Sequence, residues 1–258
     1  MKELVIIKIG GNIIDNEKAL NKFLLNYHSI KSHKILVHGG GKLATQLSEK
    51  LGIETKMVEG RRITDAETLN ITTMVYAGLI NKNVVAKLNS KGTKAIGICG
   101  ADGFLIPSTK RKKGKIDYGF VGDVVKEKIN AKLLATLLHN GYSPVLAPIT
   151  ADAKGQLLNT NADTIASSLA TALSKSYKVK LVYCFEKQGV LHNDKVISNI
   201  TKKTYITLKE QQFVKDGMIP KLDNAFDAID NGVKTVVIGH ADKLKQIIQS
   251  NAGTSITK

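Results

Sequence analysis

Short apolar runs recur along the chain, and helical patterns fill the intervals between them. The first run, Leu4–Ile9, holds one charged residue, Lys8, and a helical pattern follows from near Asn16. A run this short and apolar is typical of a strand buried on both faces. Further runs follow at Lys34–His38, Ala95–Cys99, Ser143–Ala147, Lys180–Phe185 and Thr235–Gly239, and Ser255–Thr257 is expected to pair at an edge. Strands that alternate with helices predict an α/β fold, a three-layer αβα sandwich with a mostly parallel central sheet.

The intervals between the strands predict the helices. Helices are expected over Lys42–Leu51, Thr64–Lys91 with a break at Gly78, Asn130–Asn140, Asn161–Ser174 and Gly217–Gly232. Thr64 and Glu67 have the spacing of a capping box, and alternation over residues 104–128 predicts a hairpin. A second group of strand–helix units begins near Lys180. We therefore expect one domain over residues 1–258 with two lobes, 1–179 and 180–258, and an active site across their junction.

Length and composition narrow the class of protein. A chain of 258 residues with 43% hydrophobic residues can bury a large core and is not disordered. Cys99 and Cys184 both lie in apolar runs, which favours buried, reduced thiols over a disulfide or a metal pair. No signal segment precedes the first strand, and no apolar run reaches the roughly 18 residues that cross a bilayer. We therefore expect a cytoplasmic protein.

The charge of the chain leaves several partners open. The formal net charge is +16, which suits nucleic acid, anionic small substrates or only a lysine-rich surface. Aromatic residues are 5% of the chain and tryptophan is absent, which is little for base stacking. The densest basic run, Lys110–Lys115, is expected at an exposed hairpin tip, so we favour a solvated loop there.

Two strands run directly into glycines that open a helix. Lys8 is followed by Gly10 and Gly11, and the second strand runs into Gly39–Gly41. Free backbone N–H groups at such turns bind phosphates, and three successive glycines favour that interpretation over a plain turn. The first stretch is not a Walker A loop, and Lys8 alone could equally be a lysine that snorkels from a strand end.

The polar residues at strand ends and helix starts form a cationic set. It comprises Lys8, the glycine turns, Arg62, Asn159, Asn161, Asp163 and Lys221. The sequence shows no Ser–His–Asp arrangement typical of a catalytic triad and no Cys/His spacing typical of a metal site. His38 is expected to pack at a strand end, and Asn161 also suits the N-cap of a helix. Cations and backbone donors stabilise accumulating negative charge, and phosphoryl transfer is the leading reaction of that kind.

Five motifs in this order resemble the N-acetylglutamate kinases of the amino-acid kinase superfamily. They are Lys8–Gly11, His38–Gly41, Gly60–Asp65, Asn159–Asp163 and Asp216–Lys221. The resemblance extends from Leu4 to about Thr254. It implies the amino-acid kinase fold and ATP-dependent phosphorylation of the side-chain carboxylate of N-acetyl-L-glutamate, with Mg²⁺ on the ATP, in arginine biosynthesis.

The resemblance also implies a role for each site residue. Catalytic roles fall to Lys8 and Lys221, which would stabilise the transferring phosphoryl group, and to Asp163, which would hold both lysines. Substrate binding falls to Gly40, Gly41, Arg62, Asn159 and Asn161, with Arg62 clamping a carboxylate. ATP binding falls to Gly10, Gly11, Glu186, Gly189, Asp216, Gly217 and Met218. No residue is assigned to a metal, and no general base is needed, because the attacking carboxylate, with a pKa of about 4.3, is already ionised.

Two departures from the family pattern and several alternatives belong to this prediction. Glu186 stands where the family usually has Asp, and the chain starts almost at its first strand, whereas arginine-inhibited hexameric relatives carry an extra N-terminal helix. We therefore expect a homodimer without arginine feedback.

The alternative substrate is N-succinylglutamate, the alternative enzyme is another superfamily member such as an aspartokinase, and the non-enzymatic alternative is a basic nucleic-acid-binding protein. We expect no nucleic-acid or membrane partner.

Overall fold

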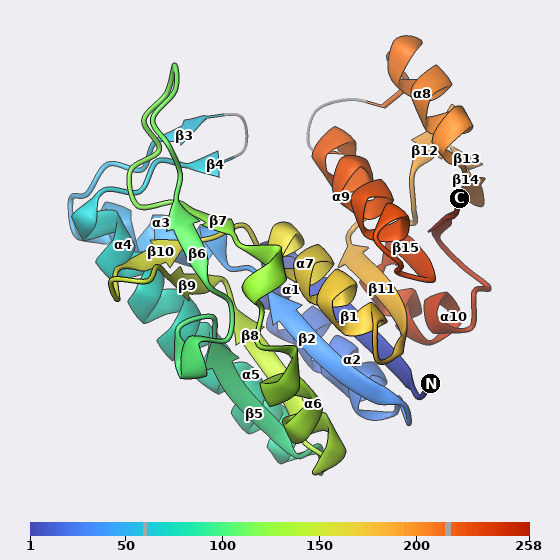
Figure 1. Cartoon of the computed structure of the whole chain (residues 1–258), viewed down its shortest axis with the longest axis horizontal. Coiled ribbons are helices and arrows are strands. Elements are labelled where there is room, and N and C mark those ends of the chain that lie inside the picture. Colours follow the sequence, from blue (N-terminus) through green and yellow to red (C-terminus); the bar gives the residue numbers. More distant parts are fainter. Residues whose placement is uncertain (59–60, 194, 215–217) are drawn as a thin grey trace.

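The computed structural model describes residues 1–58, 61–193, 195–214 and 218–258. Its central sheet has the order β14-β16-β15-β11-β1-β2-β8-β5. These strands are β1 (Glu3–Ile9), β2 (His33–His38), β5 (Ala95–Cys99), β8 (Ser143–Ala147), β11 (Lys178–Phe185), β14 (Asn199–Ile200), β15 (Thr235–His240) and β16 (Thr254–Ile256). All neighbours pair in parallel except β15 and β16. The predicted, mostly parallel sheet is therefore confirmed (Figure 1).

Helices cover both faces of this sheet. The α-helices are α1 (Gly11–Ile14), α2 (Glu17–His28), α3 (Gly41–Lys50), α4 (Ala66–Thr73), α5 (Asn81–Asn89), α6 (Ala131–His139), α7 (Ala162–Ser174), α8 (Lys202–Glu210), α9 (Met218–Asp230) and α10 (Leu244–Ile248). Leu4 and Ile6 of β1 pack with α6, α7 and α9, whereas Val5 and Ile7 pack with α2, α4 and α5 on the other face. Successive side chains of a strand point to opposite faces, so one strand serves both cores. The three-layer prediction is confirmed.

Small hairpins and short helices complete the described chain. The hairpins are β3 (Met57–Val58) with β4 (Arg61–Arg62), β6 (Ser108–Lys110) with β7 (Gly122–Val124), β9 (Ile149–Ala151) with β10 (Leu157–Asn159), and β12 (Leu191–His192) with β13 (Lys195–Val196). Three 3₁₀-helices lie at Asp102–Phe104, Lys126–Lys128 and Ala241–Lys243. The predicted hairpin over residues 104–128 is thus present, with the lysine-rich run at its exposed tip.

Three local predictions are wrong. The helical region after Thr64 does not break at Gly78, because the π-helix η1 (Met74–Ile80) joins α4 to α5 continuously. The N-cap is Asp65, whose carboxylate accepts from the Thr68 amide at 2.8 Å, instead of a Thr64 capping box. The last strand does not form the edge of the sheet, since β16 lies between β15 and β14.

The structure bears on the predictions made for the two cysteines and for membrane-spanning helices. Cys99 and Cys184 are both buried and free, as predicted. Within the described ranges, no helix is both long and apolar enough to cross a membrane.

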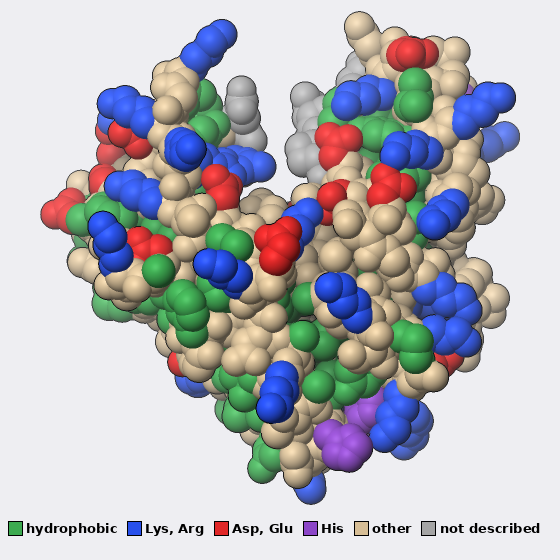
Figure 2. Space-filling model, in the orientation of Figure 1, with side chains coloured by type: hydrophobic (Ala, Val, Ile, Leu, Met, Phe, Trp, Pro, Cys, Tyr) green, Lys and Arg blue, Asp and Glu red, His purple; other side chains and the backbone are tan. Residues whose placement is uncertain are grey.

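Figure 2 shows the molecule hollowed between the side that carries the β3–β4 and β6–β7 hairpins and the side that carries α8 and α9. The carboxyl ends of β1 and β2 open toward this hollow.

Candidate active site

A lysine–aspartate–lysine cluster lies where β1 ends. Lys8 shares the face of β1 that carries Leu4 and Ile6, so its side chain points toward α7. Its Nζ lies 2.7 Å from Oδ1 of Asp163, in the first turn of α7. Lys221 of α9 donates from Nζ to Oδ2 of the same carboxylate at 3.1 Å. Three elements far apart in the sequence thus bring the three predicted catalytic side chains together.

The cluster is largely shielded from water. The side chains of Lys8 and Asp163 are only 13% and 12% exposed. Burial raises the pKa of the Asp163 carboxyl, but the attraction of Lys8 and Lys221 outweighs burial and holds that pKa below its ordinary value. Two ammonium groups with one carboxylate leave one net positive charge, which suits the binding of an anion.

Two glycine turns face each other beside this cluster. Gly11 opens α1 and Gly41 opens α3, so the first N–H groups of both helices lack intrahelical partners. A Cβ built on Gly11 would lie 3.7 Å from the Gly41 nitrogen, which shows how closely the turns approach. Gly40 has φ +150°, and a Cβ there would lie 2.1 Å from Cδ1 of Ile80. Only glycine fits this position, and the paired turns bring the first N–H groups of two helices together, an arrangement that suits an anion.

His38 supports the second glycine turn from within the core. It is fully buried, with Nδ1 2.9 Å from the Gly39 carbonyl oxygen and Nε2 3.1 Å from Nδ2 of Asn81. Because the carbonyl accepts and the amide donates, the neutral ring carries its proton on Nδ1. Burial lowers the pKa of His38 to about 4. The prediction that His38 is a packed residue is confirmed.

Arg62 is held at the entrance to the cluster. Its Nη2 donates to the Gly41 carbonyl at 2.9 Å and to Oγ1 of Thr45 at 2.8 Å, and its Nη1 donates to Oγ1 of Thr55 at 3.0 Å. The residue is 7% exposed. This guanidinium is therefore fixed beside the glycine turns, in a position that suits a carboxylate clamp.

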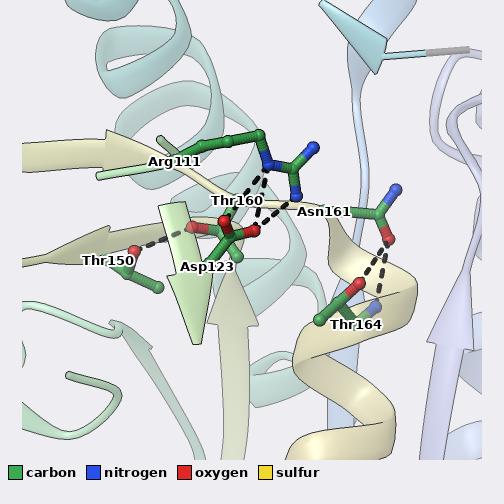
Figure 3. A network of polar contacts seen from close by, with 6 residues as sticks. All are labelled: Arg111, Asp123, Thr150, Thr160, Asn161 and Thr164. Atoms are coloured by element: carbon green, nitrogen blue, oxygen red, sulfur yellow. Dashed lines mark hydrogen bonds and ion pairs between the residues drawn. The ribbon is translucent and has the colours of Figure 1, made fainter. Parts of the chain in front are cut away.

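Two asparagines form another side of the same site. Asn161 caps α7 by accepting from the Thr164 amide at 3.0 Å, so the N-cap interpretation is correct (Figure 3). Its amide nitrogen stays free of bonds to the described residues and can donate to a ligand. Asn159 donates from Nδ2 to Oγ1 of Thr64 at 3.1 Å. Capping and substrate binding are therefore compatible at Asn161.

These groups line one cavity of about 240 Å³. The predicted residues around it are Lys8, Gly11, Gly40, Gly41, Arg62, Asn159, Asn161 and Asp163. Lys221 joins them through Asp163, and Gly10 precedes α1. Glu186 is exposed and Gly189 is buried after β11, and Met218 begins α9; these three residues do not line the cavity. Asp216 and Gly217 lie outside the described residues.

The cavity also contains residues that the sequence interpretation missed. Arg111 and Asp123, from the β6–β7 hairpin, form an ion pair at its wall, as Figure 3 shows. Tyr76 of η1 lines it too, with its ring within 3.4 Å of a Cβ built on Gly40. Arg111 belongs to the basic run interpreted as solvated loop, and nothing in the local sequence separates it from its lysine neighbours. Tyr76 lies at a helical core position, so no signal identified it either.

Comparison with known proteins gives the family. Residues 3–240 match the model of the amino acid kinase family. The chain belongs to the amino acid kinase family. It is 56% identical to an acetylglutamate kinase of Cytophaga hutchinsonii, with 97% of this chain and 96% of the relative covered. It is 54% identical over the full length of both chains to an acetylglutamate kinase of Phocaeicola vulgatus.

The fold comparison agrees with this family. The crystal structure of smu.665 from Streptococcus mutans UA159 matches with a TM-score of 0.82 at 28% identity, covering 100% of this chain and 99% of that one. The family match over residues 3–240, together with this structural match, confirms the amino acid kinase fold that the motifs predicted. The individual residue roles remain predictions, which the geometry above supports by bringing most of those side chains into one site.

Proposed function

We propose that this amino acid kinase transfers the γ-phosphoryl group of ATP to the side-chain carboxylate of N-acetyl-L-glutamate, in arginine biosynthesis. The observation that carries the proposal is the Lys8–Asp163–Lys221 cluster, of which Lys8 and Asp163 line one cavity with Arg62 and Asn161. The acetylglutamate kinases at 50–56% identity support the same reaction.

The reaction requires charge compensation and no proton transfer. A carboxylate oxygen attacks the γ-phosphorus, the bond from that phosphorus to the β–γ bridging oxygen breaks, and ADP leaves with the bond's electron pair. Lys8 and Lys221 flank the transferring group and offset its charge, while Asp163 holds both ammonium groups in place. The turns at Gly11 and Gly40 donate backbone N–H groups to the phosphate oxygens. Arg62 binds the α-carboxylate and so aligns the attacking oxygen.

Mg²⁺ would enter this site on the phosphates of ATP. Both Asp163 oxygens face lysines, so this carboxylate is not arranged as a metal ligand. Among the described residues, no group of three or more His, Cys, Asp or Glu side chains could hold a metal ion. The metal would supply charge neutralisation on the phosphates, and the chain would supply the lysines and backbone donors.

The nucleotide is proposed to lie along the carboxyl end of β11 and the start of α9. Glu186, Gly189 and Met218 stand there, and they are expected to contact ATP together with Asp216 and Gly217. This places ATP on the 180–258 lobe and the acyl amino acid on the 1–179 lobe, with the lysine cluster between them.

A homodimer in the cytoplasm is proposed as the working form. The outer side of η1 exposes Met74 by 56% and Leu79 by 53%, and β5 ends the sheet nearby. A second copy that covers these side chains would remove an apolar surface from water. Two buried free thiols and the use of ATP suit the cytoplasm. Light scattering of the purified protein measures its molar mass in solution, and a homodimer would have twice the mass of one chain.

The experiment that tests the function is an acceptor panel. ADP release is measured with ATP–Mg²⁺ and N-acetylglutamate, free glutamate or aspartate, and the product is trapped with hydroxylamine as a hydroxamate. The proposal predicts turnover and hydroxamate only with the N-acylated amino acid. Turnover only with aspartate or glutamate would identify a different amino acid kinase. Silence with all three, with tight, salt-sensitive binding of duplex DNA, would favour the nucleic-acid alternative.

A further inference from the structure

A second cavity, of about 870 Å³, lies at the end of the sheet opposite the active site. The connections that lead into the amino ends of β2, β5 and β8 form it, together with the start of β1. The active site lies at the carboxyl ends of the same parallel strands, so the two cavities lie at opposite ends of the sheet. Pockets that bind small molecules have volumes of about 300–1,000 Å³, and this cavity is within that range. The proposed function uses none of its residues.

The lining of this cavity is strongly basic. Its ionisable lysine, histidine and glutamate side chains are those of Lys2, Lys31, Lys34, Lys94, His28, His33 and Glu3. Figure 2 shows histidine and lysine side chains together at the end of the molecule away from the hollow. A smaller cavity of about 280 Å³ shares Glu3 and Ser32 with the first and adds Lys178, Lys180 and Lys234. Among the described residues that line the two cavities, Glu3 is the only acidic one, so the positive charge has little compensation within them.

Two of these lysines already have partners in the protein. Lys34 donates from Nζ to three carbonyl groups at and just after the end of α2, each at 2.9 Å. Lys180 donates from Nζ to the Ile248 carbonyl, at the end of α10, at 2.5 Å. Cations at helix carboxyl ends offset the partial negative charge of the helix dipole. Stabilisation of the helix ends therefore accounts for these two lysines.

The other lysines of the larger cavity have no such role. Lys2, Lys31 and Lys94 are exposed, and within the described ranges their side chains make no hydrogen bond and no ion pair. Burial lowers the pKa of His33, and the positive charges of Lys2 and His139 lower it further. Like charges thus repel one another at this cavity, and an anion between them would relieve that repulsion.

The type of cation indicates the type of anion. An arginine presents a planar fork that matches a carboxylate, whereas a lysine is a point charge that commonly binds phosphate. The arginines of the chain all line the active-site cavity: Arg61, Arg62 and Arg111. The second cavity has lysines and histidines instead, which favours phosphate groups over carboxylates.

Several ammonium groups around one cavity match an anion with several charges in a row. We infer that this cavity binds a chain of phosphate groups, such as that of a nucleoside triphosphate or an inorganic polyphosphate, through Lys2, Lys31 and Lys94. The site is separate from the reacting groups, so the inference does not depend on the proposed function.

The test measures the binding of sodium tripolyphosphate, GTP and citrate to the full-length protein by isothermal titration calorimetry. It compares the wild-type chain with the double variants K31Q/K94Q and K50Q/K203Q. Lys50 ends α3 and Lys203 lies on α8; both are exposed and line neither basic cavity, so the second variant loses the same charge elsewhere. Phosphate that enters the active site meets the same residues in all three proteins, so a difference between them reports on the second cavity.

K31Q/K94Q should raise the dissociation constant for tripolyphosphate by about 10-fold or more, because two charged donors are lost. K50Q/K203Q should change it by less than about twofold, because distant exposed charges are screened. Tighter binding of GTP than of tripolyphosphate would identify a nucleotide as the ligand, and GTP binding that is no tighter would identify an inorganic polyphosphate. Unchanged binding in K31Q/K94Q, equal weakening in both variants, or citrate bound as tightly as tripolyphosphate would overturn the inference. Since the assay contains no turnover, such a result would leave the proposed function intact.

Discussion

Replacing Asp163 with asparagine tests the cluster at the centre of the site. Asparagine keeps the shape of the side chain and removes its charge, so Lys8 and Lys221 would face each other without a counter-ion. Their nitrogens now lie 2.7 and 3.1 Å from the carboxylate oxygens. At an effective dielectric constant of about 20, each contact has a gross attraction of about 5–6 kcal/mol. These values are ceilings, because desolvation opposes them.

The net cost of the substitution is smaller and measurable. Removing one partner of a buried ion pair costs about 3–5 kcal/mol. Scaled by 2–4 °C per kcal/mol for a chain of this size, the loss lowers the melting temperature by about 6–20 °C. Turnover should fall by about 100-fold or more, because both lysines lose the group that aligns them.

Thermal unfolding and steady-state kinetics of Asp163→Asn are measured together, with ATP as a stabilising ligand. Because the variant carries two unbalanced ammonium groups, ATP should raise its melting temperature more than that of the wild-type chain. The folded pKa of Asp163 lies below its ordinary value, so its stabilisation is present above about pH 4 and disappears as pH falls through the folded pKa. The gap between the two proteins should therefore close in acid. Turnover within threefold of wild type, or an unchanged melting temperature, would refute this reasoning.

Three further predictions follow from the same geometry. Gly40→Ala places a Cβ against Ile80 at a φ of +150°, so it should lower the free energy of unfolding by about 1–3 kcal/mol and remove most of the activity. Gly114→Ala is the control, because a Cβ there meets nothing within 4 Å, and thermal melts and assays should show its stability and activity unchanged. Burial lowers the pKa of His38 from 6.5 to about 4, so the unfolded chain binds a proton at a higher pH than the folded chain does. The free energy of unfolding should therefore fall by up to about 3 kcal/mol as the pH drops from 6.5 to 4. In denaturation measured over this pH range, His38→Gln should remove most of that fall, and an equal fall in the variant would contradict the lowered pKa of His38. Arg62→Lys should raise the KM for the acyl amino acid by about 10-fold or more, with the KM for ATP nearly unchanged, because lysine cannot make the three hydrogen bonds that position the Arg62 guanidinium. Equal effects on both KM values would exclude a role of Arg62 in binding the acyl amino acid.

The sequence predicted those parts of the structure that local patterns encode. The apolar run Leu4–Ile9 specified a central strand, and the glycines after it specified a turn, because burial and backbone freedom are properties of a few consecutive residues. Asn161 was predicted as an N-cap and caps α7 as expected. The same reasoning, applied to the second strand, predicted the second glycine turn, which lies beside the first.

Other parts depend on contacts between distant segments. Arg111 and the lysines beside it look alike in sequence. Its place in the cavity lining depends on tertiary contacts, such as the close approach of Gly122 to Thr160 and the ion pair with Asp123. The π-helix at Met74–Ile80 carries no local signature, so a break was predicted at Gly78 where the helix continues. The edge of the sheet was likewise misplaced, because two-residue strands such as β14 have no period to detect.

The most direct test of the central claim is ³¹P NMR of the product made from N-acetylglutamate labelled with ¹⁸O in its side-chain carboxylate. The account predicts an acyl phosphate whose phosphorus resonance carries the isotope shift of a bridging ¹⁸O, formed by the wild-type enzyme and lost in Lys8→Ala. That result would show that the carboxylate oxygen attacks the γ-phosphorus at the lysine cluster. An unshifted acyl phosphate, inorganic phosphate alone, or equal product from Lys8→Ala would contradict it.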